Sequence, residues 1–181
     1  DSLSAVTGAL MLEDLGWRDL SIAVQMMAPR LVTYPMIELG NEEQKRQVLP
    51  VYAGERFIPG TAAVMEPDFR FDVGEMATTA TRQNGQFVLN GSKCYVPLAA
   101  EAQHILVYAK TDAGTRAFIV PQGTPGLNVA EREKNMGLKA LATYELTLDN
   151  CCVPADALLD GDLRGILNRT RVALAALAVG V

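Results

Sequence analysis

The first part of the chain has the spacing of amphipathic helices. From residue 3 to about 55, apolar residues recur every three or four positions, which predicts helices in SAVTGALMLEDL, DLSIAVQMMAPRLVTYPMIEL and GNEEQKRQVLPVYAGE. Pro29 and Pro35 should break or kink the second segment. The third segment has a clear start and stop, because Asn41 and Gln44 fit a capping box and Gly54 suits a helix end.

The middle of the chain has the pattern of short strands. From about residue 57 to 150, β-rich runs predict strands in FIPGTAAVM, QFVLNG, AQHILVYAK, RAFIVPQ, GLNVAE and YELTLDN. Turn signals separate these runs, at QNGQ, NGSK, TDAGT and QGTPG. Because no long helical period lies between them, we expect an antiparallel sheet, as a sandwich or a barrel.

The last residues return to helical spacing. Their apolar positions are Leu167, Val172, Leu174 and Leu177. The pattern continues to the last residue without a cap, so we expect the sequence to stop within a helix. The order of patterns therefore predicts an α+β fold with helices, then a β domain, then the start of a further helix.

Composition narrows the class of protein. Hydrophobic residues make up 49% and charged residues 20% of the 181 residues, as in ordinary globular proteins. A formal net charge of −5 argues against a nucleic-acid surface, and the apolar tail VALAALAVGV is too short to span a bilayer. Three cysteines and one histidine form neither a disulfide framework nor a zinc pattern, so we expect no metal and a cytoplasmic setting.

Five separated segments carry recognisable motifs. In chain order they are ELGNEEQKRQVLPVYAGE, MEPDFRFD, FVLNGSKCYVP, EKNMGLKALATYELTLDNCCVP and LNRTRVALAALAVGV. Together they resemble the acyl-CoA dehydrogenase family. The second and third stand where that family has Thr-Glu-Pro-x-x-Gly-Ser-Asp and Leu-Asn-Gly-x-Lys-x-Trp-Ile-Thr, and the last resembles the opening of its first C-terminal helix. The order and spacing of the segments agree with the family across nearly the whole chain.

The resemblance implies a domain organisation. Family members have an N-terminal helical domain, a middle β domain and a C-terminal four-helix domain. Residues 1–55 would then be the end of the first domain, residues 56–158 the second, and residues 159–181 the start of the third. Such a piece would expose apolar faces, so we expect a homo- or hetero-oligomer.

The resemblance also implies a reaction, the dehydrogenation of an acyl-CoA thioester across Cα–Cβ. A carboxylate removes the α-proton while the β-hydride goes to the flavin of FAD, and the protein supplies positioning. Electron-transfer flavoprotein, or a similar acceptor, would then reoxidise the flavin. The expected ligands and partner are therefore an acyl-CoA thioester, FAD and that acceptor.

The first flavin segment departs from the family pattern. Val64 and Met65 precede its Glu-Pro step, and Met65 replaces a threonine whose hydroxyl reaches the flavin. Arg70 and Phe71 replace the family's Gly-Ser, and a Cβ at the glycine position forbids the closest backbone approach. We therefore expect FAD binding to be weakened or lost. The matching residues either contact the flavin or only shape the corner, and these are Glu66, Pro67 and Asp72.

The second flavin segment departs as well. The family's Trp-Ile-Thr becomes Tyr95, Val96 and Pro97. Tyrosine can still stack on a flavin, whereas proline offers neither a hydroxyl nor an N–H. Two interpretations stay open here, a retained flavin wall and an ordinary strand end closed by proline.

No catalytic residue is identifiable in the sequence. The family's glutamate base lies either further along, in the C-terminal domain, or directly before the arginine of the first C-terminal helix. At that second position this chain has Thr170, followed by Arg171. The resemblance places Arg171, Asn168, Thr170 and Phe71 along the acyl-CoA channel, although Arg171 would also suit a solvated helix face.

Two other functions compete with dehydrogenation. One is a non-catalytic subunit of the same fold that pairs with an active partner. The other is a β-domain binding or scaffolding module without flavin. The remaining reactive side chains favour ordinary structural roles, namely His104 at a strand start and the neighbouring Cys151 and Cys152.

Overall fold

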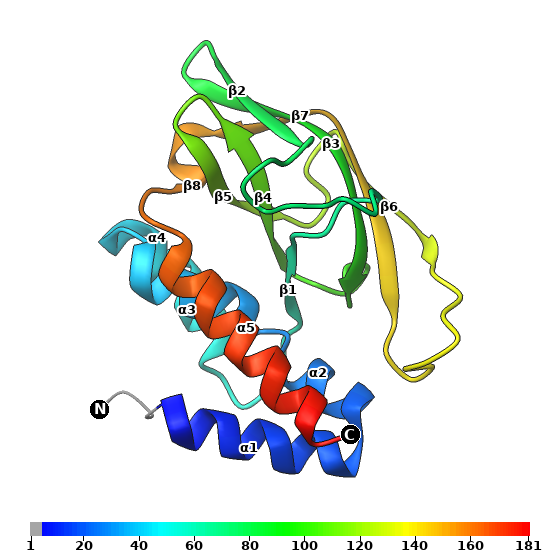
Figure 1. Ribbon diagram of the computed structural model, residues 1–181. Helices are drawn as coiled ribbons and strands as arrows, with labels where there is room; N and C mark the ends of the chain where they lie inside the picture. The colour runs from blue at the N-terminus through cyan, green and yellow to red at the C-terminus, as the bar shows by residue number, and fades with distance from the viewer. Residues whose placement is uncertain (1–4) are drawn as a thin grey trace.

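The computed structural model describes residues 5–181. Four helices come first, α1 (Ala5–Arg18), α2 (Leu20–Met27), α3 (Arg30–Leu39) and α4 (Glu42–Tyr52). The strands follow as β1 (Gly60–Ala63), β2 (Thr79–Gln83), β3 (Gln86–Pro97), β4 (His104–Thr111), β5 (Gly114–Pro121), β6 (Leu127–Arg132), β7 (Thr143–Pro154) and β8 (Leu158–Leu159). A 3-10 turn, η1 (Ala155–Ala157), precedes β8, and α5 (Arg164–Val179) ends the chain. Figure 1 shows the helices gathered at one end of the sheet.

The sheet confirms the predicted β domain. Its strands lie in the order β6-β7-β3-β2-β4-β5-β8, with β1 beside β4. In the described part of the chain its two end strands are not paired with each other, so the sheet is not closed into a barrel. Most pairs are antiparallel, but β1 and β4 run parallel, and β2 touches β4 at one parallel pair. About forty residues separate β1 from β4, so no tight hairpin forces them to be antiparallel.

One strand of the β domain was not predicted, and one predicted turn was wrong. The missed strand is β2, which is polar and has one buried residue, Ala80, so it carries no apolar signal. The NGSK turn is instead part of β3, which continues through Gly91 at φ 148° with a register shift against β7. A Cβ on Gly91 would lie 2.7 Å from the Cα of Thr78, so this glycine permits a close crossing of two backbones. The QNGQ segment is the expected hairpin turn between β2 and β3, with Asn84 and Gly85 at positive φ.

The helix signals were read correctly at α4. Asn41 Oδ1 accepts from the Gln44 amide at 2.9 Å, and Gln44 Oε1 accepts from the Asn41 amide at 2.7 Å, which is the predicted capping box. Pro29 is the N-cap of α3 and separates it from α2, whereas Pro35 lies inside α3 and does not end it. In the described residues, no helix is both long and apolar enough to cross a membrane.

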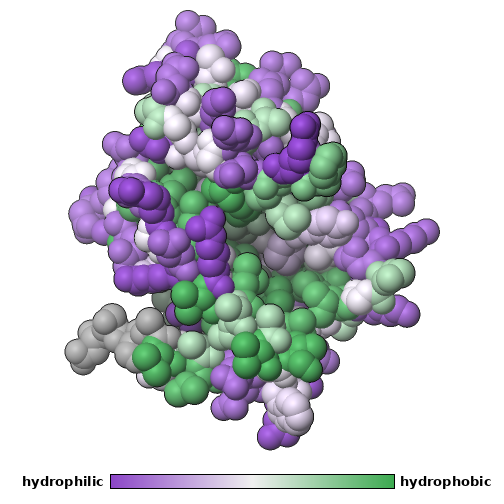
Figure 2. Space-filling model, viewed as in Figure 1, coloured by the Kyte–Doolittle hydropathy of each residue, from purple (hydrophilic) through white to green (hydrophobic). Residues whose placement is uncertain are grey.

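The apolar prediction for α5 was half right. Leu177 is buried with Leu12 and Ala23 in a small cluster that joins α1, α2 and α5, and Leu167 packs on the main core. Val172 and Leu174 are instead 54% and 58% exposed, because α5 packs mainly on α1 and leaves its opposite face free. Helix α1 also carries exposed apolar residues, namely Val6, Leu10, Met11 and Trp17. Figure 2 shows apolar side chains gathered over the lower helices.

A tyrosine–histidine contact joins α4 to the sheet. The Tyr52 hydroxyl hydrogen bonds with His104 Nδ1 at 3.1 Å, and the two ring centroids are 5.9 Å apart. Burial lowers the pKa of His104 below its ordinary value of 6.5. Burial likewise raises the pKa of Tyr52 to about 12. His104 is therefore a satisfied structural histidine that is neutral in the folded protein near neutral pH.

The His104 contact predicts a loss of stability in mild acid. Below its ordinary pKa the unfolded chain binds more protons than the folded chain, so the free energy of unfolding falls as pH decreases. We expect His104→Gln, which keeps a hydrogen-bond partner for Tyr52, to show a shallower fall between about pH 7.5 and pH 5, by at most about 1.4 kcal/mol per pH unit. Urea unfolding at each pH measures this, and equal slopes in the two proteins would contradict it.

Candidate functional site

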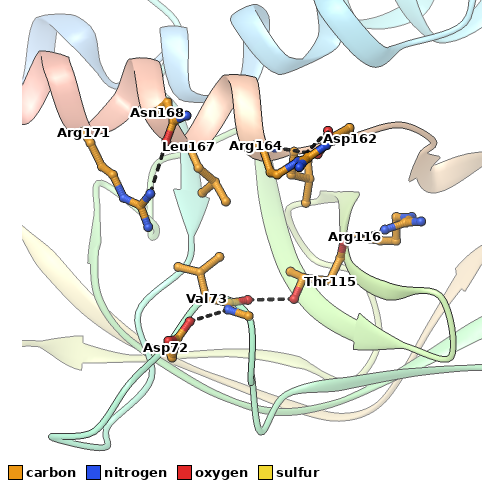
Figure 3. A pocket seen from close by; sticks show the side chains of 11 residues that line it. Asp72, Val73, Thr115, Arg116, Asp162, Arg164, Leu167, Asn168 and Arg171 are labelled. Carbon is orange, nitrogen blue, oxygen red and sulfur yellow. Dashed lines mark hydrogen bonds and ion pairs between the residues drawn. The ribbon is translucent and has the colours of Figure 1, made fainter.

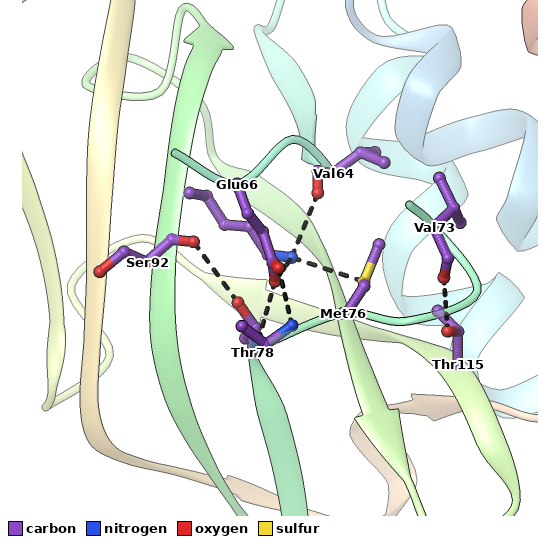
Figure 4. Close-up of polar contacts among 9 residues, drawn as sticks. Val64, Glu66, Val73, Met76, Thr78, Ser92 and Thr115 are labelled. Carbon is purple, nitrogen blue, oxygen red and sulfur yellow. Dashed lines mark hydrogen bonds and ion pairs between the residues drawn. The ribbon is translucent and has the colours of Figure 1, made fainter. Parts of the chain in front are cut away.

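The first flavin segment belongs to a loop, residues 64–78, whose two ends come together at a buried ion pair. We call this place the neck. Lys93 Nζ on β3 lies 2.9 Å from Glu66 Oε1, and the side chains are 0% and 6% exposed. The two carboxylate oxygens of Glu66 also accept from the backbone amides of Ala77 and Thr78, at 2.7 and 2.8 Å. Figure 4 shows the Glu66 carboxylate turned toward Thr78. Glu66 therefore faces inward and shapes the corner.

Opposing effects set the ionisation of this pair. Burial alone would raise the pKa of Glu66, but hydrogen bonds from Thr78, Ala77 and Lys93 outweigh it and lower that pKa to about 2. Burial also lowers the pKa of Lys93 from its ordinary value, and the Glu66 carboxylate opposes that shift. Because the carboxylate stays ionised far below neutral pH, we infer that the two groups remain a charged pair at pH 7.

The tip of the same segment projects from the sheet. Phe69 is 96% exposed, and the Arg70 guanidinium lies 5.4 Å from the centre of its ring. Asp68 Oδ1 accepts from the Arg70 amide at 2.8 Å and holds the turn. Phe71 instead packs against the main core, together with Val64 at the start of the segment. The predicted residues thus divide into an exposed cation at the tip and two apolar supports.

The second flavin segment lies against the first. The Cys94 amide donates to the Met65 carbonyl at 3.0 Å, so the residue before Tyr95 pairs directly with Met65. Met65 and Tyr95 are 46% and 55% exposed, whereas Val96 is buried. Tyr95 adopts φ 52°, and its amide donates to Glu133 Oε1 at 3.2 Å. The structure therefore brings together two predicted residues, Met65 and Tyr95, at one exposed edge, which we call the Met65–Tyr95 edge.

Pro97 closes this stretch of β3 and is half-buried. Its carbonyl side remains in the ladder, where Pro97 pairs with Thr143 of β7. The ring supplies no polar group toward the exposed edge. The exposed side chains of this edge are therefore those of Met65 and Tyr95.

A cleft of about 390 Å³ lies between α5 and the far end of the flavin segment. Asn168 and Arg171 line one side from α5, and Asp72 and Val73 line the other (Figure 3). Arg171 Nη1 donates to Asn168 Oδ1 at 3.2 Å. On the opposite side, the Thr115 hydroxyl donates to the Val73 carbonyl at 2.7 Å, which ties the segment to β5.

Two predicted substrate residues lie away from this cleft. The Thr170 hydroxyl donates to the Ile166 carbonyl at 2.9 Å within α5, and Thr170 is not among the lining residues. Phe71 is not among them either. Three charged residues at the rim of the cleft were not predicted, namely Arg116 on β5, Asp162 before α5, and Arg164 at the first position of α5. Asp162 and Arg164 are close in sequence, whereas Arg116 joins them at the cleft only in the folded chain.

Only some of the charged side chains at the rim of the cleft form a salt bridge. Arg164 lies 2.8 Å from Asp162, and hydrogen bonds from Arg164 lower the pKa of that exposed carboxyl. Arg116 donates to the neutral carbonyl of Thr115, and Arg171 to the neutral amide oxygen of Asn168. Neither guanidinium makes a salt bridge within the described residues, although the charge of Arg116 also acts on Asp162.

Other reactive groups in the described residues support no second centre. No group of three or more His, Cys, Asp or Glu residues there could hold a metal ion. The three cysteines are free. Burial raises the pKa of the Cys151 thiol to about 11, which makes it unreactive at neutral pH.

Comparisons with known proteins identify the family and agree with the fold. The family model "Acyl-CoA dehydrogenase, N-terminal domain" matches residues 1–56, and "Acyl-CoA dehydrogenase, middle domain" matches residues 61–151. The chain belongs to the acyl-CoA dehydrogenase family. Cyclohex-1-ene-1-carbonyl-CoA dehydrogenase of Geobacter metallireducens is 35% identical over 99% of this chain and 50% of its own length.

Solved structures give the same result. A glutaryl-CoA dehydrogenase from Mycobacterium smegmatis, in complex with FADH2, is similar with a TM-score of 0.85 and 32% identity, over 97% of this chain and 46% of its own. A chain in a structure of the electron transferring flavoprotein of Acidaminococcus fermentans is similar with a TM-score of 0.83 and 30% identity, over 99% of this chain and 50% of its own. The chain thus spans about half the length of the proteins it matches.

Proposed function

We propose that this protein serves the α,β-dehydrogenation of an acyl-CoA thioester with FAD. One observation carries the proposal: a single segment, residues 64–78, forms part of both ligand surfaces. Met65 at its start lies at the edge beside Tyr95. Asp72, Val73 and Gly74 further along form one side of the cleft under α5. A thioester in the cleft and a flavin on the edge would therefore be held against each other by one stretch of chain.

FAD, when bound, supplies the acceptor for the hydride. This chain would hold it through the exposed side chains of Met65 and Tyr95, with Val64, Val96 and Pro97 as the apolar support behind them. Arg70 at the segment tip is placed to meet a phosphate, and Phe71 holds the segment to the core. Because several polar contacts of the family pattern are replaced, we propose that the affinity for FAD is weakened or lost.

The thioester would lie along α5. Arg171 and Asn168 offer donors to its carbonyl or amide oxygens, whereas Phe71 and Thr170 would act only indirectly, since neither lines the cleft. The α5 sequence, RGILNRTRVALAALAV, contains neither Asp nor Glu. The α5 position that the family uses for its base is therefore without an acid, and the two carboxylates that line the cleft, Asp72 and Asp162, come from other segments.

That lack of an acid on α5 favours a second candidate function, a non-catalytic subunit of the same fold. In that case this chain would bind an active homologue and shape a shared site. The exposed apolar residues of α1 and α5 support a homo- or hetero-oligomer in either case. We further propose electron-transfer flavoprotein or a similar acceptor as the redox partner, and a cytoplasmic location, which suits the three free cysteines.

Arg171→Ala is expected to weaken the binding of butyryl-CoA by roughly 10- to 100-fold. A hydrogen bond to a charged group is worth about 1.5 to 3 kcal/mol, and about 1.4 kcal/mol is a factor of ten. Isothermal titration calorimetry with butyryl-CoA and with free CoA measures the loss. The matched control is Arg169→Ala, because Arg169 lies on the same helix but reaches Glu38 at 3.7 Å instead of the cleft. Equal affinities for the two variants would remove Arg171 from the site.

A further inference from the structure

Both ends of the segment 64–78 are fixed to the same short stretch of β3. At one end the Cys94 amide donates to the Met65 carbonyl at 3.0 Å. At the other end the Thr78 hydroxyl donates to the Ser92 carbonyl at 3.4 Å, and Thr78 crosses closely over Gly91. The segment is therefore a loop whose two legs meet at residues 91–94. Between the legs lies the side chain of Lys93.

The Lys93 ammonium touches both legs of this loop. Besides Glu66 Oε1, Nζ donates to the Val64 carbonyl at 3.2 Å and lies 3.6 Å from Met76 Sδ. Glu66 in turn reaches across to the amides of Ala77 and Thr78. One buried pair thus joins the start of the loop, its end and the strand beneath it.

Stability alone gives no reason for this arrangement. Two charges lose their hydration on burial, and well-packed apolar residues in the place of a buried ion pair often give equal or greater stability. What an apolar pair lacks is direction, because it has no donors or acceptors to fix the two legs at one spacing. Beyond the neck, the loop forms part of the Met65–Tyr95 edge and one wall of the cleft. A shift at the neck would therefore move two ligand surfaces together.

We propose that Glu66 and Lys93 are positioning residues that fix the loop 64–78 on β3 so that the Met65–Tyr95 edge and the cleft face one pair of ligands. The assignment rests on the proposed function for the identity of those ligands, FAD and an acyl-CoA thioester. The position of the loop itself is a property of this chain without any ligand. Neither residue touches a ligand directly in this scheme, and both act through Met65, Asp72 and Val73.

The decisive variant is the neutral double substitution Glu66→Gln with Lys93→Met. Gln keeps one carbonyl oxygen, which can accept from one of the two backbone amides, and Met fills most of the volume of the lysine chain. We expect Lys93→Met alone to lower the Tm, because it leaves a buried carboxylate unpaired, and the double variant to recover part of that loss. Trypsin should nevertheless cut after the exposed Arg70 about ten-fold faster in the double variant than in the unmodified chain, because cleavage follows local opening of the loop. Its affinities for FAD and butyryl-CoA should fall about ten-fold as well.

Val153→Ala is the matched control for loss of stability. Val153 is 1% exposed on β7 and pairs with Phe87, at the opposite end of β3 from Lys93. It should lower the Tm without selective cleavage at Arg70. A double variant with recovered Tm and unchanged cleavage at Arg70 would overturn the proposal.

Hydrogen exchange in the unmodified chain gives a second test that needs no substitution. The backbone amides of Ala77 and Thr78 donate to the Glu66 carboxylate, so their hydrogens should exchange as slowly as those of the central strands. Exchange as fast as at the loop tip would overturn the proposal even where the double variant fails to fold. Both the tryptic and the exchange measurements work without a ligand. Failure of the unmodified chain to bind butyryl-CoA at all would therefore count against the proposed function separately from the loop.

Discussion

The 181-residue chain is expected to bind FAD roughly 30- to 1000-fold more weakly than a variant carrying Met65→Thr, Phe71→Ser and Pro97→Thr. Each substitution returns a hydroxyl that the resemblance assigns to flavin contact. A net hydrogen bond contributes about 0.5 to 1.5 kcal/mol, so three give about 2 to 4 kcal/mol. Since about 1.4 kcal/mol is tenfold in affinity, the stated range follows. Quenching of flavin fluorescence, with both proteins titrated under the same conditions, measures the ratio.

Arg70 is the group that opposes this expectation. A charge-assisted bond to a phosphate is stronger than a neutral one, and Arg70 stands at the exposed tip of the loop. It already lies over Phe69 and 4.0 Å from Asp68 Oδ1, so it would have to exchange both contacts for a phosphate. Arg70→Gly removes both its charge and its bulk, which should act on FAD affinity in opposite directions. Tight, near-stoichiometric FAD on the unmodified chain, lost in Arg70→Gly, would show that Arg70 replaces the missing hydroxyls.

Phe71 needs its own control in that experiment. It packs against the main core, so Phe71→Ser removes apolar contacts as well as adding a hydroxyl. The double variant Met65→Thr with Pro97→Thr leaves this contact intact. It should recover about two thirds of the gain in binding free energy, with a Tm close to that of the unmodified chain.

Much of the fold could be predicted because its signals are local. The capping box at Asn41 and Gln44 and the hairpin turn at Asn84 and Gly85 each depend on residues close together in sequence. The failures have a different cause. Gly91 resembles a turn glycine until Thr78 is seen lying against it, and β2 is recognisable only through its pairing with β3. These features depend on segments that the fold alone brings together.

The candidate site divides in the same way. The family resemblance named Asn168 and Arg171 together, and both line the cleft. Arg116 was missed because it comes to the cleft from β5, about fifty residues away in the sequence. The sequence singled out Glu66 within its motif, but the meaning of that carboxylate lies in Lys93, 27 residues further along. A buried charge and its partner are usually separated in this way, so a motif names one of them and only the structure supplies the other.

The second large effect concerns turnover. The unmodified chain is expected not to dehydrogenate butyryl-CoA, because Thr170 is no carboxylate and α5 has no acid. Thr170→Glu places an acid directly before Arg171, at one of the two positions that the family uses. General-base catalysis typically contributes about 10² to 10⁴ in rate, so the variant should gain about 10² over the unmodified chain. We place the expected gain at the lower end because the Thr170 side chain bonds back to Ile166 and does not line the cleft.

The assay for this gain is reduction of an artificial electron acceptor by butyryl-CoA with saturating FAD. It is best made in the background of Met65→Thr, Phe71→Ser and Pro97→Thr, so that flavin affinity does not limit the rate. Thr170→Gln is the matched control, since it has the size of Glu without a base. Its rate should equal that of the background protein at every pH, while the Thr170→Glu rate should rise with pH as the new carboxyl ionises. Robust turnover by the unmodified chain, or equal rates for Gln and Glu, would show that the proton leaves by another route.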